Sequence, residues 1–173
     1  MLGRMLSKTT SKINKMADKR SELVAYSRLL SNPKIKAVDL IEQIILPSKF
    51  AENKDVLVIQ DTTEFNYQDH INYLDLSDNE LGPTGKDNNM GFFVHPGLVI
   101  DAETGVNMGF SYIKVWNRQI NKLNKEARNY KALPIEEKES YRWIECAQKS
   151  KTQLELAKRI TIVADRESDI YEE

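Results

Sequence analysis

Two aspartates occupy positions from which their carboxylates can act together. Asp61 comes just after the apolar run of residues 56–59, and Asp165 directly follows a second run, residues 160–164. If the two runs form parallel neighbouring strands, their carboxyl ends meet about 4.8 Å apart, where α/β sheets place their sites. Two carboxylates that close repel each other unless a cation lies between them. The pair therefore favours a hard divalent ion, Mg²⁺ or Mn²⁺.

Such ions, held about 4 Å apart, activate a water molecule and stabilise the leaving oxygen in phosphodiester cleavage. Asp61 and Asp165, called the aspartate pair below, therefore predict metal-dependent chemistry on a phosphodiester. Each aspartate can instead simply end its strand as a turn or helix-capping residue. The residues alone leave both interpretations open.

Other residues that could carry chemistry lack a supporting pattern. His70 and His95 have no metal-ligand spacing, and we expect His95 to be packed or hydrogen-bonded within a strand. Cys146 is expected to be a small buried hydrophobe. Nucleophile-elbow, P-loop and dinucleotide-binding glycine patterns do not occur. Trp116 and Arg118 could stack on or clamp nucleic acid, although an edge strand with a surface arginine is the simpler explanation.

The aspartates must be positioned by strands. Residues 56–59 and 160–164 are continuous apolar runs, which predict strands buried on both faces. Residues 92–100 and 109–115 are also strand-like, and the segment 101–105 between them predicts a hairpin turn. A hairpin followed by a helix and a further buried strand predicts a mixed sheet in an α/β domain.

Helices and loops fill the remainder. Residues 66–91 and 117–133 predict loops, and Pro134 is expected to open a helix in its first turn. A second helix is expected to begin at residues 167–173. The helix after Pro134 has one apolar or small face, which comprises Trp143, Ala147, Ser150 and Leu154.

The N-terminal region differs in composition and charge. Residues 1–20 predict a disordered or marginally helical segment, and two short helices are expected between Ser21 and Pro47. Residues 1–36 carry a formal charge of +7, whereas the other residues of the 173-residue chain sum to −8. A basic arm on an acidic body indicates a polyanionic partner for the arm, unless the arm is merely solvated.

Composition excludes several classes of protein. The chain has one cysteine, which argues against a disulfide-stapled secreted domain and fits a reducing cytoplasm. Its apolar runs are far shorter than the ~20 residues that span a bilayer, so no membrane association is expected. One domain plus a short appendage fits the length.

Six segments, in order along residues 20–173, make the sequence similar to a known family. It resembles the DDE transposases of bacterial insertion sequences, specifically the cut-and-paste family of the transposon five transposase. The segments are A-Y through N-P at residues 25–33, I-Q-D-T-T at 59–63, G-F-F-V-H at 91–95, W-x-R at 116–118, K-E-S-Y-R-W at 138–143 and V-A-D-R-E-S-D-I at 163–170.

The resemblance implies a ribonuclease-H-like mixed sheet with flanking helices as the catalytic domain, residues 51–173. A small basic helical DNA-binding region, residues 1–50, precedes it. Asp61 and Asp165 would be the first two catalytic carboxylates and would hold Mg²⁺, for which Mn²⁺ can substitute. Water would attack at the transposon end, and the freed 3′-hydroxyl would then act as nucleophile in strand transfer.

The resemblance also implies partners. The chain would bind double-stranded DNA, both the transposon ends and the target. It would form a homodimer in a complete synaptic complex. Its expected location is the bacterial cytoplasm, in association with the nucleoid. Glu139, Ser140 and Trp143 would set helix packing near the site. The expected DNA-binding residues are Lys12, Lys15, Lys19, Arg20, Trp116, Arg118 and Arg166.

The family's third carboxylate lies in a downstream Y-x(2)-R-x(3)-E-x(6)-K signature, whereas this sequence ends eight residues after Asp165. We therefore expect a C-terminally incomplete fragment with little or no activity alone. One alternative is a catalytically dead remnant that acts only as a DNA-binding module. Another is a ribonuclease-H-like nuclease with its own glutamate, for which Asp101 and Glu103 lie in a predicted turn at the wrong end.

Overall fold

The computed structural model describes residues 1–10, 12–74, 80–85, 89–120 and 132–169. The chain divides into two compact units, Met1–Gln43 and Ile44–Glu173. Each unit is described by itself.

The first unit is helical. It contains α1 (Leu2–Lys8), α2 (Ile13–Met16), α3 (Arg20–Leu30) and most of α4 (Ala37–Ile44). Met16 is fully buried, and Asp18 contacts both Arg4 and Lys8 of α1. Arg4 also reaches Glu22 of α3, with 3.2 Å between Nη2 and Oε1. Residues 1–20 thus include two short helices, and the two helices expected between Ser21 and Pro47 are confirmed as α3 and α4.

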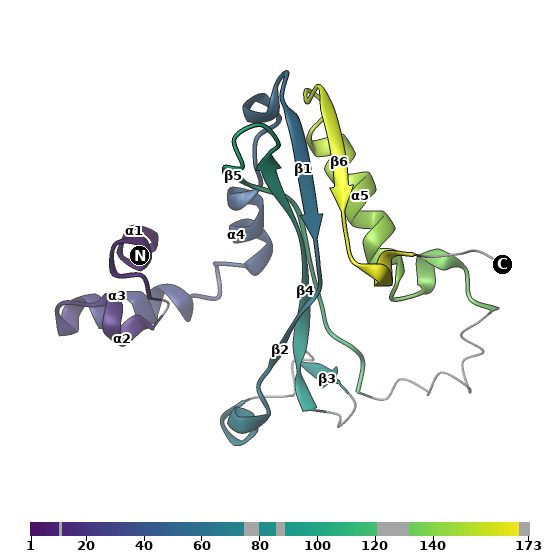
Figure 1. Cartoon of the computed structure of the whole chain (residues 1–173). Coiled ribbons are helices and arrows are strands. Elements are labelled where there is room, and N and C mark those ends of the chain that lie inside the picture. The colour runs from purple at the N-terminus through teal and green to yellow at the C-terminus, as the bar shows by residue number, and fades with distance from the viewer. Residues whose placement is uncertain (11, 75–79, 86–88, 121–131, 170–173) are drawn as a thin grey trace. The chain divides into compact units, whose positions relative to one another are not determined.

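The second unit is built on one mixed, open, six-stranded sheet (Figure 1). Its strands are β1 (Asp55–Gln60), β2 (Thr63–Asn66), β3 (Gly82–Thr84), β4 (Asn89–Asp101), β5 (Asn107–Trp116) and β6 (Arg159–Val163). The long strand β4 pairs antiparallel with β1 and β2 on one side and with β5 and β3 on the other. Strand β6 is parallel to β1 and ends the strand order. The predicted α/β class with a mixed sheet is confirmed.

Helix α5 (Tyr141–Gln153) packs on one face of the sheet against β5, β4 and β1 (Figure 1). Small side chains let it approach closely: a Cβ added to Gly97 would lie 2.8 Å from Ser111 Oγ and 3.1 Å from both Cys146 Sγ and Ser150 Oγ. The hydroxyls of Ser111 and Ser150 are 2.7 Å apart across this seam. Cys146 is fully buried, as expected, and burial raises the pKa of its thiol to about 11.

The predicted hairpin is confirmed and its turn is held by an aspartate. The carboxylate of Asp101 accepts hydrogen bonds from the backbone N–H groups of Glu103 and Thr104, each at 3.1 Å. Lys54 donates to the same carboxylate at 2.6 Å. These bonds lower the pKa of Asp101 to about 2, with the bond from Lys54 as the largest cause. Asp101 is therefore a structural residue of the turn.

The two apolar strands are not buried on both faces, which corrects the sequence prediction. In β1, Val56 and Val58 are buried on the face that α5 covers, whereas Ile59 points to the other face and is 40% exposed. Strand β6 is more open still, with Ile162 38% and Val163 40% exposed. Hydrophobicity alone could not distinguish a sheet with one covered face from a sheet with two.

The predicted loops and helices also need correction. Pro134 has an extended ψ of 149°, so the chain makes only the short 3-10 helix η4 (Ile135–Glu137) before α5 begins at Tyr141. The segment 66–91 contains the 3-10 helix η2 (Gln68–Tyr73) and β3, although parts of it lie outside the described residues.

Among the described residues are also the short 3-10 helices η1 (Ser48–Ala51) and η5 (Arg166–Ser168). In place of a helix starting at residue 167, the chain forms only η5 before residues 170–173, which lie outside the described part. Residues 121–131 of the predicted loop 117–133 also lie outside it. None of the helices within the described residues is long and apolar enough to span a bilayer.

Candidate functional site

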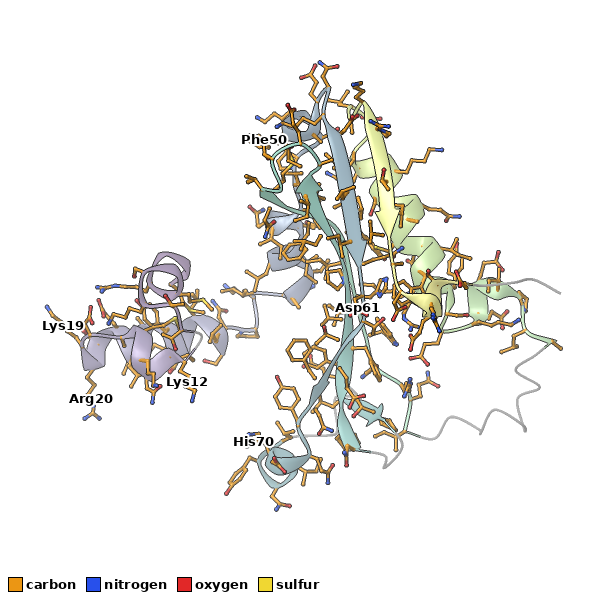
Figure 2. All side chains as sticks on the ribbon, in the orientation of Figure 1. Lys12, Lys19, Arg20, Phe50, Asp61 and His70 are labelled. Carbon is orange, nitrogen blue, oxygen red and sulfur yellow. The ribbon has the colours of Figure 1, made fainter. Side chains whose placement is uncertain are left out.

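The parallel pairing of β1 with β6 brings the segments that carry the two aspartates to the same edge of the sheet. The last paired residues are Ile59 and Val163, and each aspartate follows two positions later, just beyond the end of its strand. Both Asp61 and Asp165 are exposed, and Figure 2 shows Asp61 at the end of β1. The parallel neighbouring strands on which the metal prediction depends are therefore present.

A proline interrupts the sheet at Asp61. Strands β1 and β2 pair with β4 in one continuous register, in which Asp61 faces Pro96 and Thr62 faces His95. The N–H of Ala102 in the turn after β4 donates to the carbonyl oxygen of Asp55 in β1. Every second residue from Asp55 onward, up to the position of Asp61, is therefore one that exchanges backbone hydrogen bonds with β4. Because Pro96 has no N–H, the backbone hydrogen bonds between the two strands are interrupted opposite Asp61.

Thr62 and His95 are the next opposing residues after Asp61 and Pro96, and their side chains are in contact. Their position between hydrogen-bonded pairs is the one at which opposing side chains are closest. Thr62 Oγ1 lies 2.9 Å from His95 Nδ1, and His95 Nε2 lies 3.1 Å from Gln60 Oε1. Arg142 Nε donates to the same Thr62 oxygen at 2.8 Å.

These contacts suit a neutral His95 that carries its proton on Nε2. Since the Thr62 oxygen accepts from Arg142, its hydroxyl proton is available for His95 Nδ1, and Nε2–H then donates to Gln60. The neutral imidazole is fully buried and meets the ring of Trp143 edge-on at 4.6 Å. Burial, together with the charge of Arg142, lowers the pKa of His95 to about 4. The expectation that His95 is packed and hydrogen-bonded is confirmed.

Arg142 connects the ends of the two strands. Its Nε contacts Thr62, the residue after Asp61, and its Nη2 donates to Glu167 Oε2 at 2.7 Å. Glu167 lies in η5, two residues after Asp165. Nη1 donates to the carbonyl oxygen of Glu139 at 3.0 Å, and the Arg142 side chain is only 13% exposed.

Each aspartate also makes a local bond. Asp61 Oδ1 accepts from the N–H of Thr62 at 2.7 Å, and Asp165 Oδ1 accepts from the N–H of Glu167 at 2.8 Å. The capping interpretation therefore describes Asp165 correctly, but each bond uses one of two carboxylate oxygens. Within the described residues, no group of three or more His, Cys, Asp or Glu side chains is arranged to hold a metal ion. The donor set at this point is the aspartate pair.

A stack of two aromatic rings and a guanidinium group lies beside the aspartate pair. The rings of Phe93 and Trp116 stack with centroids 5.3 Å apart, and the guanidinium of Arg118 lies 4.5 Å from the Phe93 centroid. Glu139 accepts from Arg118 Nη2 at 3.0 Å and from Trp116 Nε1 at 3.2 Å. Burial opposes ionisation of Glu139, but the bonds and charge of Arg118 prevail and hold its pKa below the ordinary value.

These groups line one open cleft of about 380 Å³, called the aspartate cleft below. It contains five carboxylates and two guanidiniums, so it carries a negative formal charge. Its lining residues are Asp61, Thr62, Glu64, Phe93, Trp116, Arg118, Glu139, Ser140, Arg142, Asp165 and Glu167.

Other expected DNA contacts lie outside this lining. Arg166 is exposed on η5, beside Asp165. The four N-terminal cations Lys12, Lys15, Lys19 and Arg20 are exposed on the helical unit, and Figure 2 shows Lys12, Lys19 and Arg20 projecting from it. The acids of this stretch, Asp18 and Glu22, pair with Arg4 and Lys8 of α1.

Sequence reasoning did not single out Gln60, His95 or Arg142 as parts of the site. Gln60 and His95 lie within apolar strands, where polar residues that become buried are a usable signal for a hydrogen-bonded network. Arg142 lies in the K-E-S-Y-R-W segment, but only the fold brings it to Thr62, 80 residues away in the sequence. No model of a known protein family matches the sequence.

Proposed function

We propose that this chain is a transposase-like DNA-cleaving protein of the DDE type, in which Asp61 and Asp165 hold Mg²⁺, or Mn²⁺ in its place. The observation that supports the proposal is the parallel register of β1 and β6, after which the two aspartates follow at corresponding positions beside one cleft. The bound ion would polarise a phosphodiester and lower the pKa of an attacking water. The aspartates would supply the negative charge that retains it.

The sheet supports a ribonuclease-H-like fold for the catalytic part. Strands β1, β4 and β5 are antiparallel in chain order, and α5 then leads to β6, which is parallel to β1. The expected catalytic residues thus lie at the carboxyl ends of two adjacent parallel strands, where α/β sheets carry their sites.

Residues beside the pair fit a nucleic-acid substrate. The exposed Arg166 offers positive charge beside Asp165, and the partly exposed Trp116 offers an aromatic ring in the same cleft. Arginine and aromatic rings are the groups that bind phosphates and stack on bases. We propose that they orient a DNA strand so that its phosphodiester reaches the aspartate pair.

Nicking of supercoiled plasmid by the full chain in Mn²⁺ tests this function. We expect Asp61→Asn and Asp165→Asn each to abolish nicking, whereas Asp69→Asn, an equivalent change at an exposed position on η2, leaves it unchanged. Nicking that persists in both cleft variants would disprove the assignment. Mn²⁺ binding measured in parallel tests the pair even if turnover is too slow to detect.

A second candidate is DNA binding without cleavage, which the N-terminal cations favour. Lys12, Lys15, Lys19 and Arg20 are exposed, while the neighbouring acids Asp18 and Glu22 pair with Arg4 and Lys8. Phosphate contacts make binding depend steeply on salt, by about 0.9 in the logarithmic slope for each contact. Substituting all four with Gln should flatten this slope by roughly two to four, measured by fluorescence anisotropy. An unchanged slope would rule out this surface.

A further inference from the structure

We propose that Arg142 is the positioning residue that sets the separation of Asp61 and Asp165, an inference that rests on the metal site proposed above. Backbone pairing between β1 and β6 ends at Ile59 and Val163, so it does not reach the two aspartates. Beyond that point, Arg142 joins the segments that carry them.

The guanidinium contacts three segments with three different nitrogens. Nε holds Thr62 at 2.8 Å, Nη2 holds Glu167 at 2.7 Å, and Nη1 holds the Glu139 carbonyl at 3.0 Å. The first contact fixes the residue after Asp61, and the second fixes the turn that Asp165 caps. The third anchors the guanidinium to the segment that leads into α5.

The geometry requires arginine in particular. Its planar fork presents several donors at fixed angles, whereas lysine offers a single flexible ammonium group. A lysine at position 142 would keep the positive charge near the aspartates but could not hold Thr62 and Glu167 at once. Charge and positioning can therefore be separated by one substitution.

The opposite end of the same two strands supplies a matched control. There Arg159 of β6 donates from Nη2 to Asp55 Oδ2 of β1 at 2.6 Å. Arg159→Lys is the same chemical change, also in a bridge between β1 and β6, but it lies far along the strands from the aspartates. It reports what the loss of an inter-strand arginine does without disturbing the proposed metal site.

The test is Mn²⁺ affinity, measured on the full chain by the electron paramagnetic resonance signal of free Mn²⁺. Losing a partner that orients metal ligands typically weakens binding by ten- to a hundred-fold. We expect Arg142→Lys to weaken Mn²⁺ binding at least about ten-fold and Arg159→Lys to change it by less than about two-fold. Circular dichroism spectra confirm that each variant is folded.

A second pair of variants tests the same link without touching a charge. Thr62→Val removes the hydroxyl that Arg142 holds, whereas Thr62→Ser keeps it. We expect weaker Mn²⁺ binding in the first and near-normal binding in the second. This pair also decides the question if Arg142→Lys does not fold.

The possible outcomes are distinct. If Asp61→Asn lowers Mn²⁺ affinity but Arg142→Lys does not, the positioning role is wrong and the aspartate pair stands. Equal weakening in Arg142→Lys and Arg159→Lys would also overturn it, because the effect would then be general. If the wild-type chain does not bind Mn²⁺, or binds it as well without Asp61, the proposed function fails and the positioning role fails with it.

Discussion

Individual side chains at the site are held by a chain of directed hydrogen bonds. The two ring nitrogens of His95 contact Thr62 and Gln60, and the ring is fully buried. A proton added to the ring would place a charge in a buried position near the guanidinium of Arg142, which lowers its pKa. Burial of this histidine therefore makes the fold sensitive to acid.

We predict that this histidine makes stability fall on acidification. Its folded pKa of about 4 lies below the usual 6.5, so the unfolded chain binds the proton first. Its contribution is complete above pH 6.5 and is lost as the pH falls toward 4. Between pH 7 and pH 5 the loss is about 2 kcal/mol.

Urea unfolding at pH 7 and at pH 5 measures this loss of stability. The loss attributed to His95 should disappear in His95→Gln and remain in His70→Gln, which changes the exposed histidine on η2. Equal pH dependence in wild type and His95→Gln would contradict the protonation assigned here.

Among the elements, α5 has the closest contact with the sheet. The two elements meet in a tightly packed seam formed by Gly97, Ser111, Cys146 and Ser150. Glu145 of α5 adds a polar tie by accepting from Tyr112 on β5 at 2.8 Å. Since α5 begins beside Glu139 and carries Arg142, its depth against the sheet sets where the guanidinium lies.

Gly97→Ala tests this seam. The added methyl group would clash with Ser111 Oγ and crowd Cys146 Sγ and Ser150 Oγ, so we expect it to lower the free energy of unfolding by roughly 1–3 kcal/mol. Gly3→Ala is the control, because nothing lies within 4 Å of that position in α1. Thermal or urea unfolding distinguishes them, and equal stabilities would mean that α5 can shift without cost.

The sequence allowed β1, β4, β5, β6 and the hairpin to be predicted, because each depends on local hydrophobic patterns and turn residues, whereas the short strands β2 and β3 were missed. The start of α5 was wrong by several residues, since the extended backbone of Pro134 is not visible in an apolar pattern. The link from Arg142 to Thr62 could not be foreseen, because it spans 80 residues and exists only after β1 and α5 are packed. Sequence periodicity reports which face is apolar, not which side chains meet.

At the scale of the whole molecule, charge is unevenly distributed. The first 36 residues carry +7, whereas the aspartate cleft contains five carboxylates and two guanidiniums. In the proposed function, DNA phosphates would be attracted by the N-terminal cations but repelled at the cleft unless divalent ions offset its charge.

This charge distribution predicts that DNA binding becomes stronger either when the aspartate charges are removed or when a divalent ion offsets them. In EDTA, the Asp61→Asn/Asp165→Asn double variant should bind duplex DNA more tightly than wild type, because two repelling charges are gone. Adding Ca²⁺ at constant ionic strength should strengthen wild-type binding several-fold and leave the double variant almost unchanged. Fluorescence anisotropy measures both.

The control for this prediction removes two acidic charges elsewhere. Asp69→Asn with Glu103→Gln changes exposed positions outside the aspartate cleft, and this variant should respond to Ca²⁺ as wild type does. If all three proteins respond alike, the divalent ion acts through the DNA rather than through the aspartate pair.

The parallel pairing of β1 with β6 also affects the order in which parts of the chain fold. The two aspartates are separated by 104 positions, and the hairpin and α5 lie between them. Contacts between such distant residues form late, after the local hairpin and helix contacts. On the ribosome, β1 and the hairpin emerge first and wait for β6 to be synthesised. Capture of a divalent ion would therefore mark the final step of folding, and its rate would report when the sheet is complete.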